Sequence, residues 1–311
     1  MSRVPIFASA CVALLCAYHF KNRENLSAED FRCDQGLGYD VMNLTYGRTA
    51  YKLAGPKEGK FVVIVHGGTL GSMAYQAYVA PLVSAGYRVC SYDQFGRGFS
   101  DRPKEPLSID MMRIQLLDLL NYLKVEKAFL YGVSFGGSIL ARFAAEHPNR
   151  VRGLGYQVPV ICGVTVSKLI QMVHMPVLGP LIARFIAIPA IISRGESFGT
   201  ETEEARKIVN HFKGQFAVQG TERMITELFT GDALSDRIAD HEVIGCETNL
   251  RAQFVYAADD SEIAAEQIEN AISLYKKENI EIHTYLGGHF FSSGYVNELT
   301  SKLDKFFQSC D

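Results

Sequence analysis

The sequence lacks the patterns that mark several specialised classes of protein. Its seven cysteines contain no C-x-x-C pair, and Cys11 and Cys16 lie in an apolar N-terminal segment, so we expect no disulfide framework. The net charge is only −3 and no long run of like charges occurs, so nucleic acid is not an expected partner. No H-E-x-x-H spacing is present, and no G-x-G-x-x-G follows the first buried strand pattern. The sequence therefore predicts neither a metal nor a dinucleotide cofactor.

An apolar segment without Asp, Glu, Lys or Arg covers residues 4–20, with Arg3 before it and Lys21 after it. Its 17 residues are at the short limit for a membrane span and long for the apolar region of a signal peptide. We expect a membrane anchor, followed by a polar linker that separates it from the fold. This predicts a membrane-associated protein of the endoplasmic reticulum or secretory pathway, with secretion after signal cleavage as the alternative.

Apolar strand patterns and helical patterns alternate along the chain from about residue 40. The run Phe61-Val-Val-Ile-Val is typical of a strand buried on both faces of a parallel sheet. Strand and helix patterns then alternate up to a strand at 151–158, and the alternation resumes at residue 252. This order predicts an α/β fold with a mostly parallel, doubly wound sheet. We expect residues 1–35 to form the anchor and linker, 36–158 and 241–311 the core, and 159–240 an inserted helical cap.

The pentapeptide Gly132-Val133-Ser134-Phe135-Gly136 lies between an apolar strand pattern and a helical one. A G-x-S-x-G sequence in this context predicts a nucleophile elbow, which presents the serine hydroxyl beyond the edge of the sheet. Residues two places from the serine would contact the strand and the helix, so both must lack a Cβ atom. Ser134 is therefore the candidate nucleophile, at the free N-terminus of a helix.

The groups that such a serine needs are found after other strand patterns. His289 follows the last strand, at the edge of a parallel sheet where catalytic groups gather, and is the candidate base. Asp259 and Asp260 follow the strand that ends near residue 256, and the residues alone leave the choice between them open. One of the two is expected to serve a turn or a helix N-cap instead.

The oxyanion donors are expected to be backbone N–H groups. One comes from Phe135, directly after the nucleophile, and the other from Gly68, in the loop after the strand at 61–65. We expect His66 to hold this loop by hydrogen bonds.

Over residues 40–307 the chain resembles a capped α/β-hydrolase. The resemblance rests on His66-Gly67-Gly68, Asp93-x-x-Gly96-x-Gly98-x-Ser100, Gly132-x-Ser134-x-Gly136, Asp260 and His289, in that order. It implies a catalytic triad of Ser134, His289 and Asp260. Ala257 stands in place of the glycine of the family's Gly-x-x-Asp segment, which favours Asp260 over Asp259. The serine is unlike the aspartate of haloalkane dehalogenases and epoxide hydrolases, and the chain is most similar to monoacylglycerol-lipase-like serine esterases.

The resemblance implies cleavage of a carboxylic ester through an acyl-enzyme, with no cofactor. Residues 169–192 are strongly apolar, and Pro176, Pro180 and Pro189 are expected to break them into short helices. We expect some of these residues to line a passage to Ser134, which predicts a lipophilic, monoacylglycerol-like substrate. An acyltransferase, a carbon–carbon bond hydrolase and a non-catalytic binding protein of the same fold are the alternatives. The oligomeric state stays open.

Overall fold

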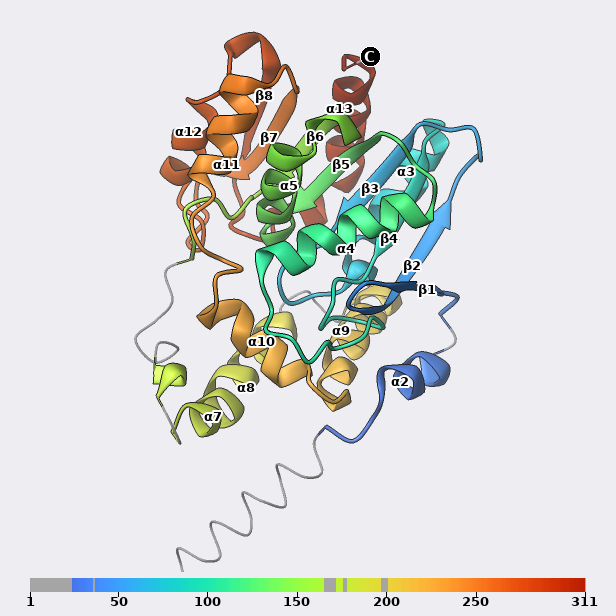
Figure 1. The fold of residues 1–311 in the computed structure, drawn as a ribbon, viewed down its shortest axis with the longest axis vertical. Helices are drawn as coiled ribbons and strands as arrows, with labels where there is room; N and C mark the ends of the chain where they lie inside the picture. The colour runs from blue at the N-terminus through green and yellow to red at the C-terminus, as the bar shows by residue number, and fades with distance from the viewer. Residues whose placement is uncertain (1–23, 36, 165–171, 176–177, 197–200, 311) are drawn as a thin grey trace, which may run out of the picture.

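A computed structural model describes residues 24–35, 37–164, 172–175, 178–196 and 201–310 (Figure 1). The described residues form an eight-stranded sheet in the order β1-β2-β4-β3-β5-β6-β7-β8. The strands are β1 (Asp40–Leu44), β2 (Gly47–Ala54), β3 (Phe61–Val65), β4 (Arg88–Tyr92), β5 (Ala128–Val133), β6 (Val151–Gln157), β7 (Ala252–Ala257) and β8 (Ile280–Tyr285). Only the pairs β1–β2 and β2–β4 are antiparallel, which confirms the predicted mostly parallel sheet.

The central strands are buried on both faces, as their unbroken apolar sequences predict. Every residue of β3 and of β5 is buried. The register pairs Val65 with Gly132 and Val133 with Gln157, so the carboxyl ends of β3, β5 and β6 lie at one edge of the sheet. Side chains that follow these three strands are therefore brought together.

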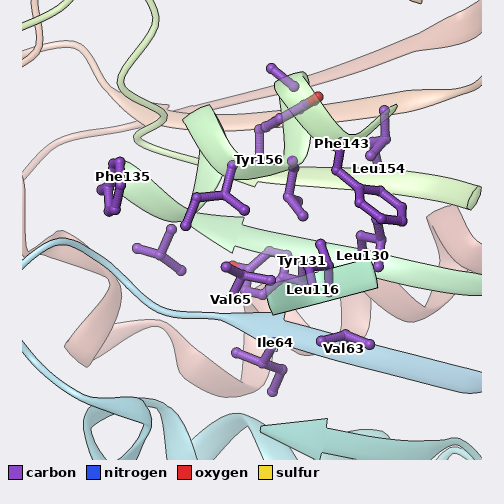
Figure 2. Packing of buried hydrophobic residues seen from close by; sticks show 14 of the residues in the cluster. Val63, Ile64, Val65, Leu116, Leu130, Tyr131, Phe135, Phe143, Leu154 and Tyr156 are labelled. Atoms are coloured by element: carbon purple, nitrogen blue, oxygen red, sulfur yellow. The ribbon is translucent and has the colours of Figure 1, made fainter. Parts of the chain in front are cut away.

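Helices cover both faces of the sheet. The helices α4 (Ile109–Tyr122), α5 (Phe135–Glu146), α11 (Ile238–Glu242) and α12 (Ala265–Ile272) pack along one face, and α3 (Val79–Ser84) contacts α13 (Val296–Gln308) on the other. Figure 2 shows Leu116 and Phe143 from the first face packed over apolar side chains of β3 and β5. Helix α4 begins directly after Ser108, because the Ser108 hydroxyl accepts a hydrogen bond from the Met111 N–H.

Between β6 and α11 the described residues form helices, which Figure 1 shows gathered below the sheet. They are η3 (Met172–His174), α7 (Leu178–Ile182), the π-helical η4 (Ala183–Ala187), α8 (Ile188–Glu196), α9 (Glu203–Gly214) and α10 (Thr221–Thr230), with the 3₁₀ turn η5 (Gln215–Ala217) before the last. We refer to α7–α10 as the cap helices.

The proline-rich part of the cap differs from the expectation. The pieces are short, but residues 178–196 run on without a break at Pro180 or Pro189. Pro180 lies in the first turn of α7, where backbone N–H groups have no partner within the helix. Pro189 comes just after the π-helical turn, where the hydrogen-bond ladder is already irregular.

The expected polar linker is also partly wrong, because its second half packs on the fold. Helix α2 (Ala28–Gln35) buries Phe31, whose ring centroid lies 5.1 Å from that of Phe99 and 5.3 Å from that of His211. Leu26 forms a parallel bridge with Val218, next to the cap helix α10. The predicted anchor at 4–20 lies outside the described residues. Among the residues that the structure describes, none of the helices combines the length and the apolar character that crossing a membrane requires.

Candidate active site

Ser134 alone forms the turn between β5 and α5. Its φ of 51° and ψ of −117° lie in a region that residues with a Cβ atom rarely adopt. A Cβ atom on Gly132 would lie 2.7 Å from the Gly136 oxygen, and one on Gly136 would lie 2.1 Å from the Val65 oxygen. The close approach of β5, α5 and β3 therefore requires both glycines, as predicted. Hydrogen bonds from the Ser134 N–H to the Gln157 oxygen (2.9 Å) and from the Gly137 N–H to the Ser134 oxygen (2.8 Å) hold the turn.

The structure brings the predicted nucleophile, base and orienting acid into one chain of hydrogen bonds. His289 Nε2 lies 3.1 Å from Ser134 Oγ, and His289 Nδ1 lies 2.8 Å from Asp260 Oδ2. The other carboxylate oxygen of Asp260 accepts hydrogen bonds from the N–H groups of Glu262 (2.8 Å) and Ile263 (3.1 Å). With Nδ1–H donating to Asp260, the lone pair of Nε2 faces the serine hydroxyl and can take its proton.

The adjacent acids have different partners. Asp259 is exposed and accepts hydrogen bonds from the N–H groups of Gly287 (2.9 Å) and Gly288 (3.0 Å). These bonds lower the pKa of the Asp259 carboxyl, the bond from Gly288 contributing most. Asp259 therefore shapes the loop that carries His289, whereas Asp260 contacts the histidine itself. One acid of the pair was expected to serve a turn. Asp260 also does so, because its second carboxylate oxygen accepts the N–H groups of Glu262 and Ile263.

The predicted oxyanion loop lies against the elbow, and Gly68 and Phe135 line the same cavity as Ser134. His66 holds this loop as predicted, because its Nδ1 lies 2.7 Å from the Gly67 oxygen and its Nε2 accepts the Gln94 N–H at 2.9 Å. Full burial lowers the pKa of His66 to about 4, so the ring is neutral at neutral pH.

Arg97 is a second support of the oxyanion loop, and the sequence analysis missed it. Its side chain is fully buried, and Nε donates to the Gly68 oxygen at 2.7 Å while Nη1 donates to the Phe95 oxygen at 2.8 Å. Burial lowers the pKa of Arg97 to about 9. The available signal was its position between two glycines, Gly96 and Gly98.

A cavity of about 460 Å³ opens at Ser134, within the size range of small-molecule sites. Apolar side chains form most of its wall, and the cap contributes Ile191, Arg194 and Leu228. Ile191 belongs to the apolar segment at 169–192, of which some residues are expected to line a passage to Ser134. Leu181 and Phe185 of the same segment do not line the cavity. Phe185 is instead 44% exposed.

An ion pair across this cavity was not predicted either. Arg194 of α8 forms an ion pair with Glu262, which lies just after Asp260 in the loop that follows β7. Glu262 Oε2 lies 4.0 Å from His289 Nε2, and the Arg194 guanidinium lies 5.3 Å from the Phe290 ring centroid. The pair joins the cap to the core beside His289. Within the described part of the chain, no group of His, Cys, Asp and Glu side chains is placed to hold a metal ion.

Comparison with known proteins supports the fold. Residues 60–160 match the family model of the alpha/beta hydrolase fold. The AB hydrolase superfamily protein YfhM of Bacillus subtilis is 32% identical over 103 residues, which are 32% of this chain and 36% of that protein. The 2-hydroxymuconate semialdehyde hydrolase of Pseudomonas sp. strain CF600 is 34% identical over 96 residues, 30% of this chain and 34% of that protein. A haloalkane dehalogenase of Mycolicibacterium paratuberculosis is 33% identical over 106 residues, 33% and 35% of the two chains. The chain thus matches about a third of the length of these relatives.

Solved structures are similar over far more of the chain. A bromoperoxidase from Bacillus anthracis has a TM-score of 0.71 at 18% identity, covering 87% of this chain and all of that one (100%). A meta-cleavage product hydrolase from Pseudomonas fluorescens IP01 has a TM-score of 0.65 at 20% identity, covering 88% and 98% of the two chains. A bacterial membrane phospholipase A has a TM-score of 0.70 at 17% identity, covering 99% of this chain and 96% of that one. At these identities the likeness concerns the fold. Together with the sheet order and the elbow, it shows that the chain has the α/β-hydrolase fold.

Proposed function

We propose that the protein is a serine hydrolase that cleaves a lipophilic carboxylic ester, such as a monoacylglycerol. The observation that carries this proposal is the hydrogen-bonded chain from Ser134 Oγ through His289 to Asp260, with lengths of 3.1 and 2.8 Å, at the wall of a largely apolar cavity. A hydroxyl in contact with an oriented neutral imidazole is the arrangement that acyl transfer requires.

The reaction proceeds in two half-reactions. Ser134 Oγ attacks the ester carbonyl and gives its proton to His289 Nε2, while the N–H groups of Phe135 and Gly68 stabilise the oxyanion. The histidine then protonates the departing alcohol, which leaves an acyl-enzyme on Ser134. Water, deprotonated by His289, hydrolyses this second ester and restores the serine.

The similarity to haloalkane dehalogenases does not lead us to propose dehalogenation, because position 134 is a serine. Displacement of a halide by a serine hydroxyl would form an ether, which water cannot readily cleave, whereas an acyl-serine is an ester and can be turned over. The second candidate is hydrolysis of a carbon–carbon bond by the same triad. It is favoured by the similarity to the 2-hydroxymuconate semialdehyde hydrolase and to the meta-cleavage product hydrolase. Acyl transfer to an acceptor other than water uses the same acyl-enzyme and remains the third reaction open to this triad.

A lipophilic substrate and a membrane location are supported by the outer surface of the cap. Met172, Met175, Phe185 and Ile186 are all exposed there. The apolar sequence at 4–20 supports association with a membrane of the endoplasmic reticulum or secretory pathway through the N-terminal segment. One structural neighbour is itself named a membrane phospholipase A.

The test is covalent labelling combined with an ester series. A fluorophosphonate should modify Ser134, and Ser134→Ala should lower kcat by at least about 10³-fold, as other triad deletions do. Ser138→Ala is the matched control, because the Ser138 hydroxyl is engaged with the Val160 oxygen at 2.8 Å. An adduct on Ser138 or Ser261 would contradict the proposal. Turnover of a vinylogous diketone without turnover of any ester would favour the carbon–carbon bond hydrolase.

A further inference from the structure

Two cavities meet at the catalytic histidine. The cavity of about 460 Å³ is lined by Ser134 and by both oxyanion residues, Gly68 and Phe135. A second cavity of about 190 Å³ is lined by none of these three. Tyr75, His289 and Phe290 line both. We call them the acyl chamber and the alcohol chamber, for the reasons that follow.

Tyr75 marks the boundary between the chambers, directly beside the nucleophile. A Cβ atom built on Gly67 would lie 3.4 Å from the Tyr75 hydroxyl oxygen and 3.5 Å from Ser134 Cβ. The Gly67 N–H hydrogen-bonds to the same hydroxyl. The buried Tyr75 ring is therefore held against the loop that carries Gly67 and Gly68. A substrate bound at Ser134 extends into the chambers on the two sides of this ring.

The smaller chamber is apolar inside and has an acid at its mouth. One wall is the 3₁₀ helix η1 (Ser72–Tyr78), and the opposite wall is α9, with Ala205 and Ile208. The polar Gln157 in its lining is already engaged, since the Tyr78 hydroxyl donates to Gln157 Oε1 at 3.0 Å. Glu204 is exposed at the mouth, and the described lining includes no Lys or Arg. Such a chamber fits a short, neutral group and disfavours an anionic one.

The chemistry of the tetrahedral intermediate assigns each chamber to one part of the ester. The new bond joins Ser134 Oγ to the carbonyl carbon, and the oxyanion lies at the N–H groups of Gly68 and Phe135. The bond that breaks joins this carbon to the alcohol oxygen, which must take the proton from His289 Nε2. The alcohol therefore departs on the histidine side, whereas the acyl chain stays attached to Ser134 in the acyl-enzyme.

We propose that the larger chamber binds the acyl part of the substrate and the smaller one its alcohol part. This assignment rests on the proposed ester hydrolysis. The larger chamber has the volume of a complete small-molecule site, and the smaller one lies below that range. The substrate class is then a bulky or long-chain acyl ester of a short, uncharged alcohol. Esters with an anionic alcohol part, such as a phosphate-bearing headgroup, are disfavoured.

The experiment narrows one chamber at a time and varies one half of the ester at a time. Ala205→Phe and Ala77→Phe narrow the alcohol chamber from its two opposite walls, and Val164→Phe narrows the acyl chamber. The substrates are methyl, butyl and hexyl butanoate, methyl octanoate, and the butanoate ester of glycolate, whose alcohol part is anionic. Each added methylene that is buried raises kcat/KM by at most about fourfold.

In the wild type, kcat/KM should rise from methyl to butyl butanoate and level off at hexyl butanoate, because the smaller chamber is then full. The glycolate ester should fall below methyl butanoate. Ala205→Phe and Ala77→Phe should each lower the hexyl-to-methyl ratio at least about tenfold, with less than about a twofold change in the ratio of methyl octanoate to methyl butanoate. Val164→Phe should do the reverse. Because one acyl-enzyme is common to all butanoates, the alcohol effect should appear in kcat/KM and not in a kcat limited by deacylation.

An exchanged pattern, in which Ala205→Phe lowers the acyl-length ratio, would overturn the assignment of the chambers. So would equal effects of all three variants on both ratios, or a preferred glycolate ester. A wild-type protein that turns over no ester at all would instead remove the proposed function, so the two failures are distinguishable.

Discussion

At the scale of single residues, two acids that are neighbours in the sequence have different partners in the site. Asp259 and Asp260 follow β7 side by side, yet one carboxylate binds two backbone N–H groups of the histidine loop and the other binds the histidine ring. Consecutive residues after a strand point in different directions, so adjacent acids can serve different partners. In the proposed reaction Asp260 therefore orients the histidine, and Asp259 holds the loop that carries it.

Replacing each acid by its amide separates the two roles. Asp260→Asn should lower kcat by about 10⁴-fold, because the amide donates to Nδ1 and leaves the proton on the nitrogen that must accept it from serine. Asp259→Asn keeps one acceptor oxygen, which can accept from both Gly287 and Gly288, and should lower kcat about tenfold at most through the lost charge on those bonds. Steady-state kinetics on one soluble ester checks this. A larger loss at Asp259 would contradict the triad described above.

At the scale of elements, a buried histidine lies where α11 meets the sheet. The His241 ring centroid lies 5.4 Å from that of Tyr156 in β6 and 6.2 Å from that of Phe254 in β7. Its Nδ1 lies 2.8 Å from the Tyr275 hydroxyl, and its Nε2 has no hydrogen-bond partner among the described residues. Burial lowers the pKa of His241 to about 3. Packing of α11 therefore requires an uncharged ring.

This burial predicts a loss of stability in mild acid. Below pH 6.5 the unfolded chain binds a proton at His241 that the folded chain does not, so the free energy of unfolding falls by about 1.4 kcal/mol per pH unit. The stability is complete above pH 6.5 and is lost as the pH falls towards the folded pKa of about 3. Between pH 7.5 and 5.0, His241→Gln should lose about 2 kcal/mol less than the wild type.

Urea unfolding at the two pH values measures this difference. Fully buried His66 has the same sign of effect, with its pKa lowered to about 4, so part of the acid sensitivity should persist in His241→Gln. If the free energy of unfolding changed equally with pH in His241→Gln and in the wild type, the burial of His241 would not be a source of the acid sensitivity.

The parts of the fold that could be predicted are those that depend on residues close together in the sequence. The elbow is a contiguous motif, and Asp260 and His289 each follow a segment whose sequence has a strand pattern. Arg97 and Glu262 could not be predicted in the same way, because their partners, Gly68 and Arg194, are distant in the chain and are brought close only by the fold. Helix α2 was missed for a similar reason, since its single buried aromatic residue, Phe31, gives no helical period.

At the scale of the whole molecule, the exposed apolar side chains of the cap lie near the point where the described chain begins. The Glu222 N–H at the start of α10 donates to Glu24 Oε1 at 2.8 Å, and the Glu222 carboxylate lies 3.5 Å from the buried Arg184 guanidinium. Arg184 directly precedes the exposed Phe185 and Ile186. The described chain therefore begins close to the part of the cap that carries these residues, which supports the proposal that the cap faces a membrane.

Making this surface polar should impair access to membrane-bound substrate. The double substitution Phe185→Ser and Ile186→Ser should lower kcat/KM on a monoacylglycerol in phosphatidylcholine vesicles at least about fivefold, because burial of each side chain is worth about 1.5–3 kcal/mol. Turnover of ethyl butanoate in solution should change less than about twofold, since neither side chain lines the cavities described above.

The matched control is Ile282→Ser on β8, where an isoleucine is exposed to a similar extent, 43% against 42% for Ile186. It should leave both rates as in the wild type. Equal losses on vesicles for the control and the double variant would show that the cap surface has no special relation to the membrane.

The backbone at Ser134 implies a conflict between two kinds of natural selection. Its left-handed φ of 51° costs about 1–3 kcal/mol for a residue with a side chain, a sizeable share of the roughly 5–15 kcal/mol that keeps a domain folded. Glycine would adopt the same conformation freely. Selection for thermal robustness alone would therefore drive position 134 towards glycine, and only selection for turnover opposes it. A lineage that stopped using the reaction would gain stability by the same substitution that ended catalysis.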